Sequence, residues 1–107
     1  MNFLFSQSHK ERVKEIFTKL TNTKSDESHF SEIENLFFEV ISIVRIYGNN
    51  LDDNKFLADL KKLEANEYML ILDRKLTKKN RETGIRRLKN SIKQILQKWL
   101  KQAVAVV

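Results

Sequence analysis

The last third of the chain constrains the fold most, because residues 74–101 combine a basic composition with a helical repeat. This stretch contains eleven Lys and Arg residues and one acidic residue, Glu82. Apolar residues recur in it at alternating spacings of three and four, namely Ile85, Leu88, Ile92, Ile95 and Trp99. Such spacing is typical of an amphipathic helix that buries one stripe of side chains. We therefore expect a helix from about Glu82 to Ala103, with a core-facing seam and a basic outer face.

The composition of the whole chain also favours helices. The 107 residues include no Pro, no Cys and only two Gly, so turn-forming residues are too sparse for a β-sandwich or a β-barrel. The length fits one domain. We expect an all-α fold, a compact bundle of about five helices. Within this single domain, residues 1–29 would form an N-terminal helix and a polar loop, and residues 30–107 the helical bundle.

The first helix is expected to begin at Ser8. Ser8 and Glu11 have the spacing of a capping box, in which each side chain bonds the other residue's free backbone amide. The apolar stripe behind this cap consists of Val13, Ile16, Phe17 and Leu20. Residues 21–28 contain no apolar side chain and are expected to form a loop. This first helix could be attached to the main bundle without being part of its core.

The second helix is expected to be the most buried. It would start near Ser28 or Ser31 and run to Tyr47, with Gly48 at a position typical of a C-terminal cap. Besides a regular apolar stripe, further apolar residues widen its arc, namely Leu36, Phe38, Ile41, Ile43 and Ile46. A helix with so wide an apolar arc packs against several neighbours.

Two more helices are expected before the final one. Asp52 or Asp53 would cap the third helix, whose core-facing residues are Phe56, Leu57, Leu60 and Leu63. The register of apolar residues shifts at 65–67, and a continuous apolar run follows. We therefore expect a fourth helix over 67–77. A turn over 76–80 would separate it from the final helix.

No catalytic or metal site is expected. Nucleophilic catalysis requires a Ser, Thr or Cys beside a base, and neither His9 nor His29 lies in such a motif. Two His and no Cys are also too few for a zinc site without carboxylate ligands. Asp52 and Asp53 begin like a calcium loop, but the Gly and Glu that complete one are missing. We therefore expect that the protein is not an enzyme and that it needs no cofactor.

Charge is divided unevenly along the chain. Residues 1–53 contain six basic and nine acidic groups, whereas residues 54–107 contain fourteen and five, and the formal net charge is +6. This asymmetry indicates an electropositive face and an acidic or polyanionic partner. A biased codon usage is the alternative explanation. Cations concentrate where they oppose the positive N-terminal end of the final helix, so a bound anion or acidic peptide would offset their cost.

Residues 50–90 carry a pattern that is similar to a known module. Its parts are a turn formed by Asn50, Leu51 and Asp52, leucines at 57, 60 and 63, an apolar fourth segment, and the string from Ile85 to Lys89. Leu96 and Trp99, followed by Lys101, close the pattern. The chain resembles the N-terminal LW domain of transcription elongation factor S-II, and most of all the integrase-binding domain of the LEDGF family. The resemblance covers roughly residues 30–102.

This resemblance implies a five-helix bundle that binds short acidic peptides with an apolar anchor, from transcription or chromatin regulators. The resemblance also implies that the protein is located in the nucleus. If the resemblance is set aside, we expect a cytoplasmic location. Binding would use the loops after the second and fourth helices, with Leu88 as an exposed apolar contact and cations around it. The candidate partner-binding residues are Gly48, Asn49, Asn50, Lys78, Lys79, Arg81, Arg86, Arg87, Leu88, Lys89 and Lys93.

Two other kinds of partner stay open. A small basic helical subunit would contact the phosphate backbone of a nucleic acid without reading its sequence, because no aromatic residues interleave the basic run. Alternatively, the chain would associate with itself through the C-terminal helix, extended by residues 103–107. A membrane is not expected as a partner, since no apolar stretch is long enough to span one and Met1–Phe5 lacks the features of a signal peptide.

Overall fold

The computed structural model describes the backbone of residues 7–47 and 51–105, and the side chains of residues 9–47 and 53–101. Within these ranges the chain is helical and contains no strand. The elements in chain order are α1 (Gln7–Asn22), the 3-10 turn η1 (Glu27–His29), α2 (Phe30–Tyr47), α3 (Leu51–Leu63), the π-helical turn η2 (Glu64–Tyr68), α4 (Met69–Ile71) and α5 (Lys78–Ala105). The expected all-α class is confirmed. The expected count of about five is slightly wrong, because α3, η2 and α4 form one continuous helix and the bundle has four.

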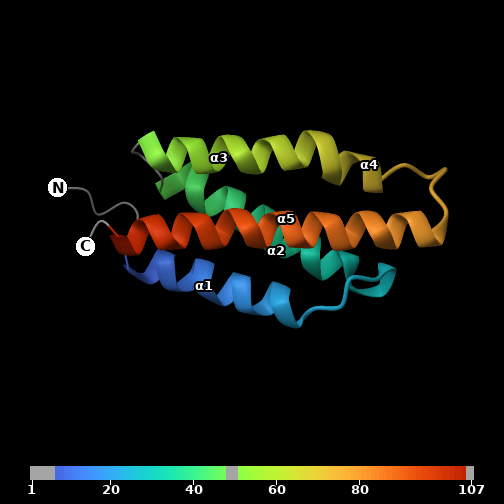
Figure 1. Ribbon diagram of the computed structural model, residues 1–107, viewed down its shortest axis with the longest axis horizontal. Helices are drawn as coiled ribbons and strands as arrows, with labels where there is room; N and C mark the ends of the chain where they lie inside the picture. The colour runs from blue at the N-terminus through green and yellow to red at the C-terminus, as the bar shows by residue number, and fades with distance from the viewer. Residues whose placement is uncertain (1–6, 48–50, 106–107) are drawn as a thin grey trace.

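The four helices run alternately in opposite directions (Figure 1). α1 contacts α2 and α5, and α3 contacts α2 and α5. α1 and α3 therefore lie diagonally across the bundle. The start of α1 and the end of α5 lie at one end, and the connection from α4 to α5 lies at the other (Figure 1).

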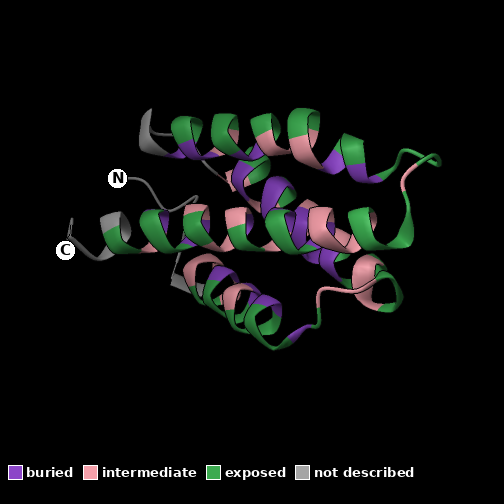
Figure 2. Ribbon diagram, turned by 45° about the vertical axis from the view of Figure 1, so that its right-hand side comes forward, coloured by how far each residue is buried: buried purple, intermediate pink, exposed green. Residues whose placement is uncertain are grey.

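The hydrophobic core runs between the helices along the bundle. Buried residues lie on the inner sides of the helices, and exposed residues lie mostly on their outer sides (Figure 2). α1 contributes three fully buried residues, Val13, Ile16 and Leu20. A fully buried aliphatic side chain stabilises a fold by about 1.5–3 kcal/mol relative to an exposed one. α1 is therefore an integral part of the bundle and not an addition to it.

α2 is buried along much of its length, as expected. Its buried residues are Ile33, Leu36, Phe37, Val40, Ile41 and Val44. Ile46, which was expected to widen the apolar arc, is 64% exposed. α2 begins at Phe30, near the expected Ser28 or Ser31. Asp26 caps the preceding turn η1 by accepting the backbone N–H of His29 at 3.0 Å. Hydrogen bonds from the side chains of His29 and Ser28 lower the pKa of Asp26 to about 2.

The expected register shift at 65–67 corresponds to the π-helical turn. The N–H of Met69 bonds to the carbonyl of Glu64, five residues earlier, so one extra residue is accommodated without ending the helix. Tyr68, at the end of this turn, and Ile71 after it are both buried in the core. The expected separate fourth helix over 67–77 is wrong in this respect, since the helix continues from α3 and ends at Ile71.

α5 starts four residues earlier than expected. Thr77 caps it by accepting the N–H of Asn80 at 3.1 Å, and the helix then continues through the expected turn region. The buried stripe is Ile85, Leu88, Ile92, Leu96 and Trp99, so Leu96 replaces Ile95 as the most buried residue of its turn.

Trp99 is a core residue, as expected. Its indole ring stacks on Phe56 with ring centroids 4.9 Å apart, and its N–H donates to the buried carboxylate of Asp53 at 3.2 Å. These contacts join the C-terminal half of α5 to the start of α3. In the part of the chain that the structure describes, no helix is both long enough and apolar enough to cross a membrane.

Candidate functional site

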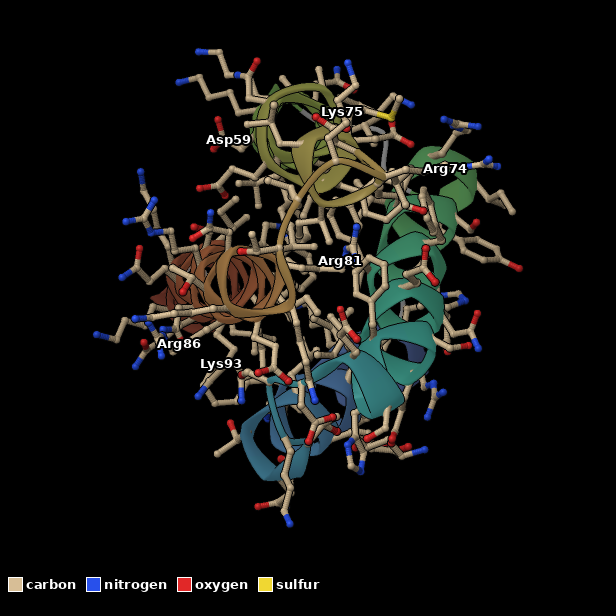
Figure 3. The ribbon with its side chains drawn as sticks, turned by 90° about the vertical axis from the view of Figure 1, so that its right-hand side faces the viewer. Asp59, Arg74, Lys75, Arg81, Arg86 and Lys93 are labelled. Carbon is tan, nitrogen blue, oxygen red and sulfur yellow. The ribbon has the colours of Figure 1, made fainter. Side chains whose placement is uncertain are left out.

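A groove lies between α4, with its preceding π-helical turn, and the first half of α5. Its volume is about 370 Å³, and it is lined by Glu67, Leu70, Ile71, Leu76, Asn80, Thr83, Gly84 and Arg87. The α5 residues of this lining follow a spacing of three and four, so they share one side of the helix. Figure 3 views the bundle from the end where the loop from α4 enters α5.

Gly84 lets the two walls of the groove approach each other. A Cβ atom at this position would lie 3.1 Å from Cγ1 of Ile71, which is a tight contact. The absence of a side chain at 84 therefore allows α4 to lie close to α5. The shape of the groove therefore depends on the close approach of Ile71 to Gly84 and on the end of α4 at Ile71.

The surface of α4 and of Leu72, the residue after it, is unusually apolar. Met69 is 55% exposed, Leu70 is 66% exposed and Leu72 is 45% exposed. Only Tyr68 and Ile71 of this apolar run are buried. Contiguous exposed apolar side chains often mark an interaction site, whereas single ones do not. Leu70 both belongs to this exposed group and lines the groove.

Two opposite charges line the groove without pairing. Among the residues that the structure describes, no ion pair involves Glu67 or Arg87. The Oε2 atom of Glu67 is buried and has no hydrogen-bond partner. Arg87 is exposed at the groove. The groove therefore offers an unsatisfied acceptor and a free cation beside an apolar surface.

Arg81, expected to bind a partner, is instead engaged within the chain. Its guanidinium donates to the carbonyls of Ile71 at 3.3 Å and Asp73 at 2.8 Å, and to Oε1 of Glu27 at 3.1 Å. Arg81 thus binds the carbonyl of Ile71, at the C-terminal end of α4, where carbonyls have no partner inside the helix. It also ties the loop after α4 to η1.

Lys89 is likewise engaged within the chain. Its ammonium group donates to the carbonyl of Thr23 at 2.7 Å, which joins α5 to the loop after α1. Burial, and to a smaller extent the nearby Lys93, lowers the pKa of Lys89. Lys93 itself lies 5.5 Å from the ring centroid of Phe17 on α1. These contacts give both cations a structural role.

Leu88 is not the exposed apolar contact that was expected. It is fully buried, because the spacing of Ile85, Leu88 and Ile92 places all three on the core-facing side of α5. The apolar surface next to the basic residues comes from Leu70, and from Leu76 in the loop after α4.

The remaining expected cations are exposed but lie outside the groove, apart from Arg87. Lys78, Lys79 and Arg86 are exposed on the first turns of α5. Arg86 and Lys93 extend from the side of α5 that is turned away from α4 (Figure 3). Of the expected cations, only Arg87 lines the groove.

The expected contribution of Gly48, Asn49 and Asn50 lies outside the described residues. The residues that flank them, Tyr47 and Leu51, lie at the opposite end of the bundle from Lys78 (Figure 1). Among the described residues, Arg87 is the one expected partner-binding residue that lines the groove. Its other lining residues were not expected, namely Glu67, Leu70, Ile71, Leu76, Asn80, Thr83 and Gly84. The apolar run from Tyr68 to Leu72 is the signal that pointed to them, because a surface helix can bury only part of such a run.

A second, smaller hollow lies between α1 and the C-terminal half of α5. Its volume is about 320 Å³, and its lining residues are Phe17, Gln97, Leu100 and Lys101. It borders the C-terminal segment that was expected to support self-association, but the side chains of residues 102–107 lie outside the described residues. Across the described ranges, no three His, Cys, Asp or Glu side chains are grouped so that they could hold a metal ion.

Comparisons of the chain with protein-family models, with curated proteins and with solved structures give no match. The resemblance to the LW domain stays a prediction. Its five helices are not observed, because residues 78–105 form one continuous helix.

Proposed function

We propose that the protein is a non-enzymatic interaction module that binds a short acidic peptide with an apolar anchor. The anchor would enter the groove between α4 and α5. The observation that carries this proposal is the groove itself, in which the exposed Leu70 and the unpaired Arg87 lie on facing walls.

The apolar wall supports an aliphatic or aromatic anchor. Leu70, Ile71 and Leu76 would surround such a side chain, and Gly84 lets the wall formed by Ile71 approach α5 closely. Transfer of a Leu or Phe side chain from water to an apolar site contributes about 1.5–3 kcal/mol. One buried anchor of this kind commonly dominates the binding energy of a peptide.

The cations around the groove support an acidic partner. Arg87 lies in the lining, and Lys78 and Lys79 are exposed on the first turn of α5, next to the lining residue Asn80. Cations at a rim raise the rate of association with an acidic peptide more than they raise the final affinity. A carboxylate that bonds Arg87 next to the apolar anchor would add a charge-assisted hydrogen bond.

The class of partner follows from the resemblance alone. If the likeness to the LW domain holds, the peptides belong to transcription or chromatin regulators and the protein works in the nucleus. The groove supports only the chemical part of this proposal, an apolar anchor beside acidic residues.

Two adjacent arginines provide the experiment. Arg86 and Arg87 are both exposed and have the same charge, but only Arg87 lines the groove. The probe is a set of short synthetic peptides, each with one Leu or Phe flanked by Asp and Glu, and fluorescence anisotropy measures their affinity. Arg87→Glu should lower affinity by about tenfold or more, because it places a like charge at the bound carboxylate. Arg86→Glu should have a clearly smaller effect.

A nucleic-acid-binding subunit is the second candidate, and the outer face of α5 favours it. Lys79, Arg86, Lys98 and Lys101 are exposed there, and Glu82 is the single acidic residue of the helix. Such a face would neutralise phosphates without reading bases. Random duplex and single strands titrated with salt test this candidate. A slope of several released counterions, together with equal losses for Arg86→Glu and Arg87→Glu, would favour it over the peptide module.

A further inference from the structure

Glu67 is the most unusual polar group of the described surface. Several other described carboxylates are paired: Glu39 bonds Arg12, Glu64 bonds Lys61, and Glu34 accepts the hydroxyl of Tyr68 at 2.5 Å. Glu67 has neither an ion pair nor a hydrogen bond for its buried Oε2 atom. The residue as a whole is half-buried, so one oxygen of its carboxylate is shielded from water without gaining a hydrogen bond in return, which costs free energy.

The place of Glu67 suggests where its partner comes from. It lines the same groove as Arg87, but the two side chains do not form an ion pair. It also belongs to the π-helical turn η2, and such turns are frequently found at functional sites. The groove thus presents a carboxylate at one position of its apolar hollow and a guanidinium at another.

We propose that Glu67 binds an ammonium group of the peptide, next to the apolar anchor. The proposal rests on the proposed function, because it assigns one more contact to the same groove. A full positive charge compensates a half-buried carboxylate better than a neutral N–H or O–H donor does. The ligand would then carry an ammonium group on one side of its anchor and a carboxylate, for Arg87, on the other.

Two sources supply such an ammonium group. It can be the free N-terminus of a peptide whose first residue is the anchor, or the side chain of a Lys that precedes an internal anchor. Three peptides with the same acidic tail distinguish them. The first begins with a free N-terminal Leu, the second is identical but N-acetylated, and the third is N-acetylated with a Lys before the Leu.

The affinities of these three peptides are measured on the wild type, on Glu67→Gln and on the control Glu64→Gln. Glu64 belongs to the same turn but pairs with Lys61 and does not line the groove. The wild type and the control should prefer an ammonium-bearing peptide over the acetylated one by about ten- to a hundredfold. Glu67→Gln should lose this preference while keeping its affinity for the acetylated peptide. Its thermal unfolding midpoint shows whether the variant is folded.

Each other result is decisive. Equal affinity of the wild type for all three peptides would overturn the role of Glu67 and leave the proposed function standing. A preference that persists in Glu67→Gln would also overturn it, because the ammonium group would then bind elsewhere. If the wild type binds none of the three, and none of the peptides with an internal anchor, both proposals fail together.

Discussion

Arg81 and Arg87 have the same charge and lie six residues apart on α5, but they differ in what surrounds them. Arg81 faces the end of α4 and donates to the carbonyls of Ile71 and of Asp73 in the loop after it, whereas Arg87 is exposed at the groove. Leu70 and Leu88 form a similar pair, one 66% exposed and the other fully buried. At the scale of single residues, the role of a side chain depends on whether its side of the helix faces another helix or the solvent.

Leu88 and Leu70 give a direct test of these positions. Leu88→Ala should lower the free energy of unfolding by about 2–5 kcal/mol, because it leaves a cavity in the core. Leu70→Ala should change it by less than about 0.5 kcal/mol, as is usual for exposed sites. Urea unfolding followed by circular dichroism measures both. A small effect of Leu88→Ala would mean that Leu88 is not in the core.

Tyr68 makes the stability depend on alkaline pH. Burial, together with the hydrogen bond to Glu34, raises the pKa of Tyr68 to about 12. Because the folded state favours the neutral phenol, this contribution to stability is complete below the unfolded pKa of about 10. It is lost as the pH rises from about 10 to 12. Urea unfolding across this range should show a decline in the wild type that is reduced in Tyr68→Phe; equal declines would contradict the assignment.

At the scale of elements, the spacing of apolar residues predicts which face of a helix is buried but not how helices continue. Ile85, Leu88, Ile92 and Trp99 follow from their spacing alone. The register shift near Ala65 was also visible, but a helix break and a π-helical turn produce the same shift. The hydrogen bond from Met69 to Glu64 distinguishes the two. Ile95 and Leu96 are both apolar, so the sequence does not show which of them is buried. The packing of α5 against its neighbours buries Leu96.

The start of α5 carries an unfavourable charge arrangement. Lys78 and Lys79 occupy the first turn, next to backbone N–H groups that have no partner within the helix. Lys79→Glu should therefore raise the free energy of unfolding by about 0.3–1 kcal/mol at low salt. Lys98→Glu, a reversal at an exposed site in the C-terminal half, should not raise it. Thermal unfolding at low and high salt measures both, and an equal gain for the two variants would exclude the helix dipole as the cause.

At the scale of the whole molecule, the order of the helices decides what the groove contains. The antiparallel arrangement brings the end of α4 beside the start of α5, which places an exposed apolar run against the basic half of the chain (Figure 1). The all-α class and the basic character of α5 were predictable from composition and spacing. The groove was not, because it depends on the close approach of Ile71 to Gly84 and on the π-helical turn that orients Glu67.

The same arrangement separates two basic surfaces that look continuous in the sequence. Arg87 belongs to the groove, while Arg86 and Lys93 extend from the side of α5 turned away from α4 (Figure 3). A peptide and a nucleic acid would therefore contact different parts of α5. This separation makes the position of a bound partner informative about the kind of partner.

The most direct measurement is a nuclear magnetic resonance titration of the labelled protein with an acidic peptide that carries a Leu or Phe anchor. If the groove is the binding site, the backbone amide signals that shift will cluster at residues 67–76 and 80–87, on the two walls of the groove. Amides near Phe17 and Leu100, at the smaller hollow, will stay unchanged. Shifts that follow Lys93, Lys98 and Lys101 along the outer face of α5, or the absence of any shift, would contradict the assignment of the groove as the peptide site.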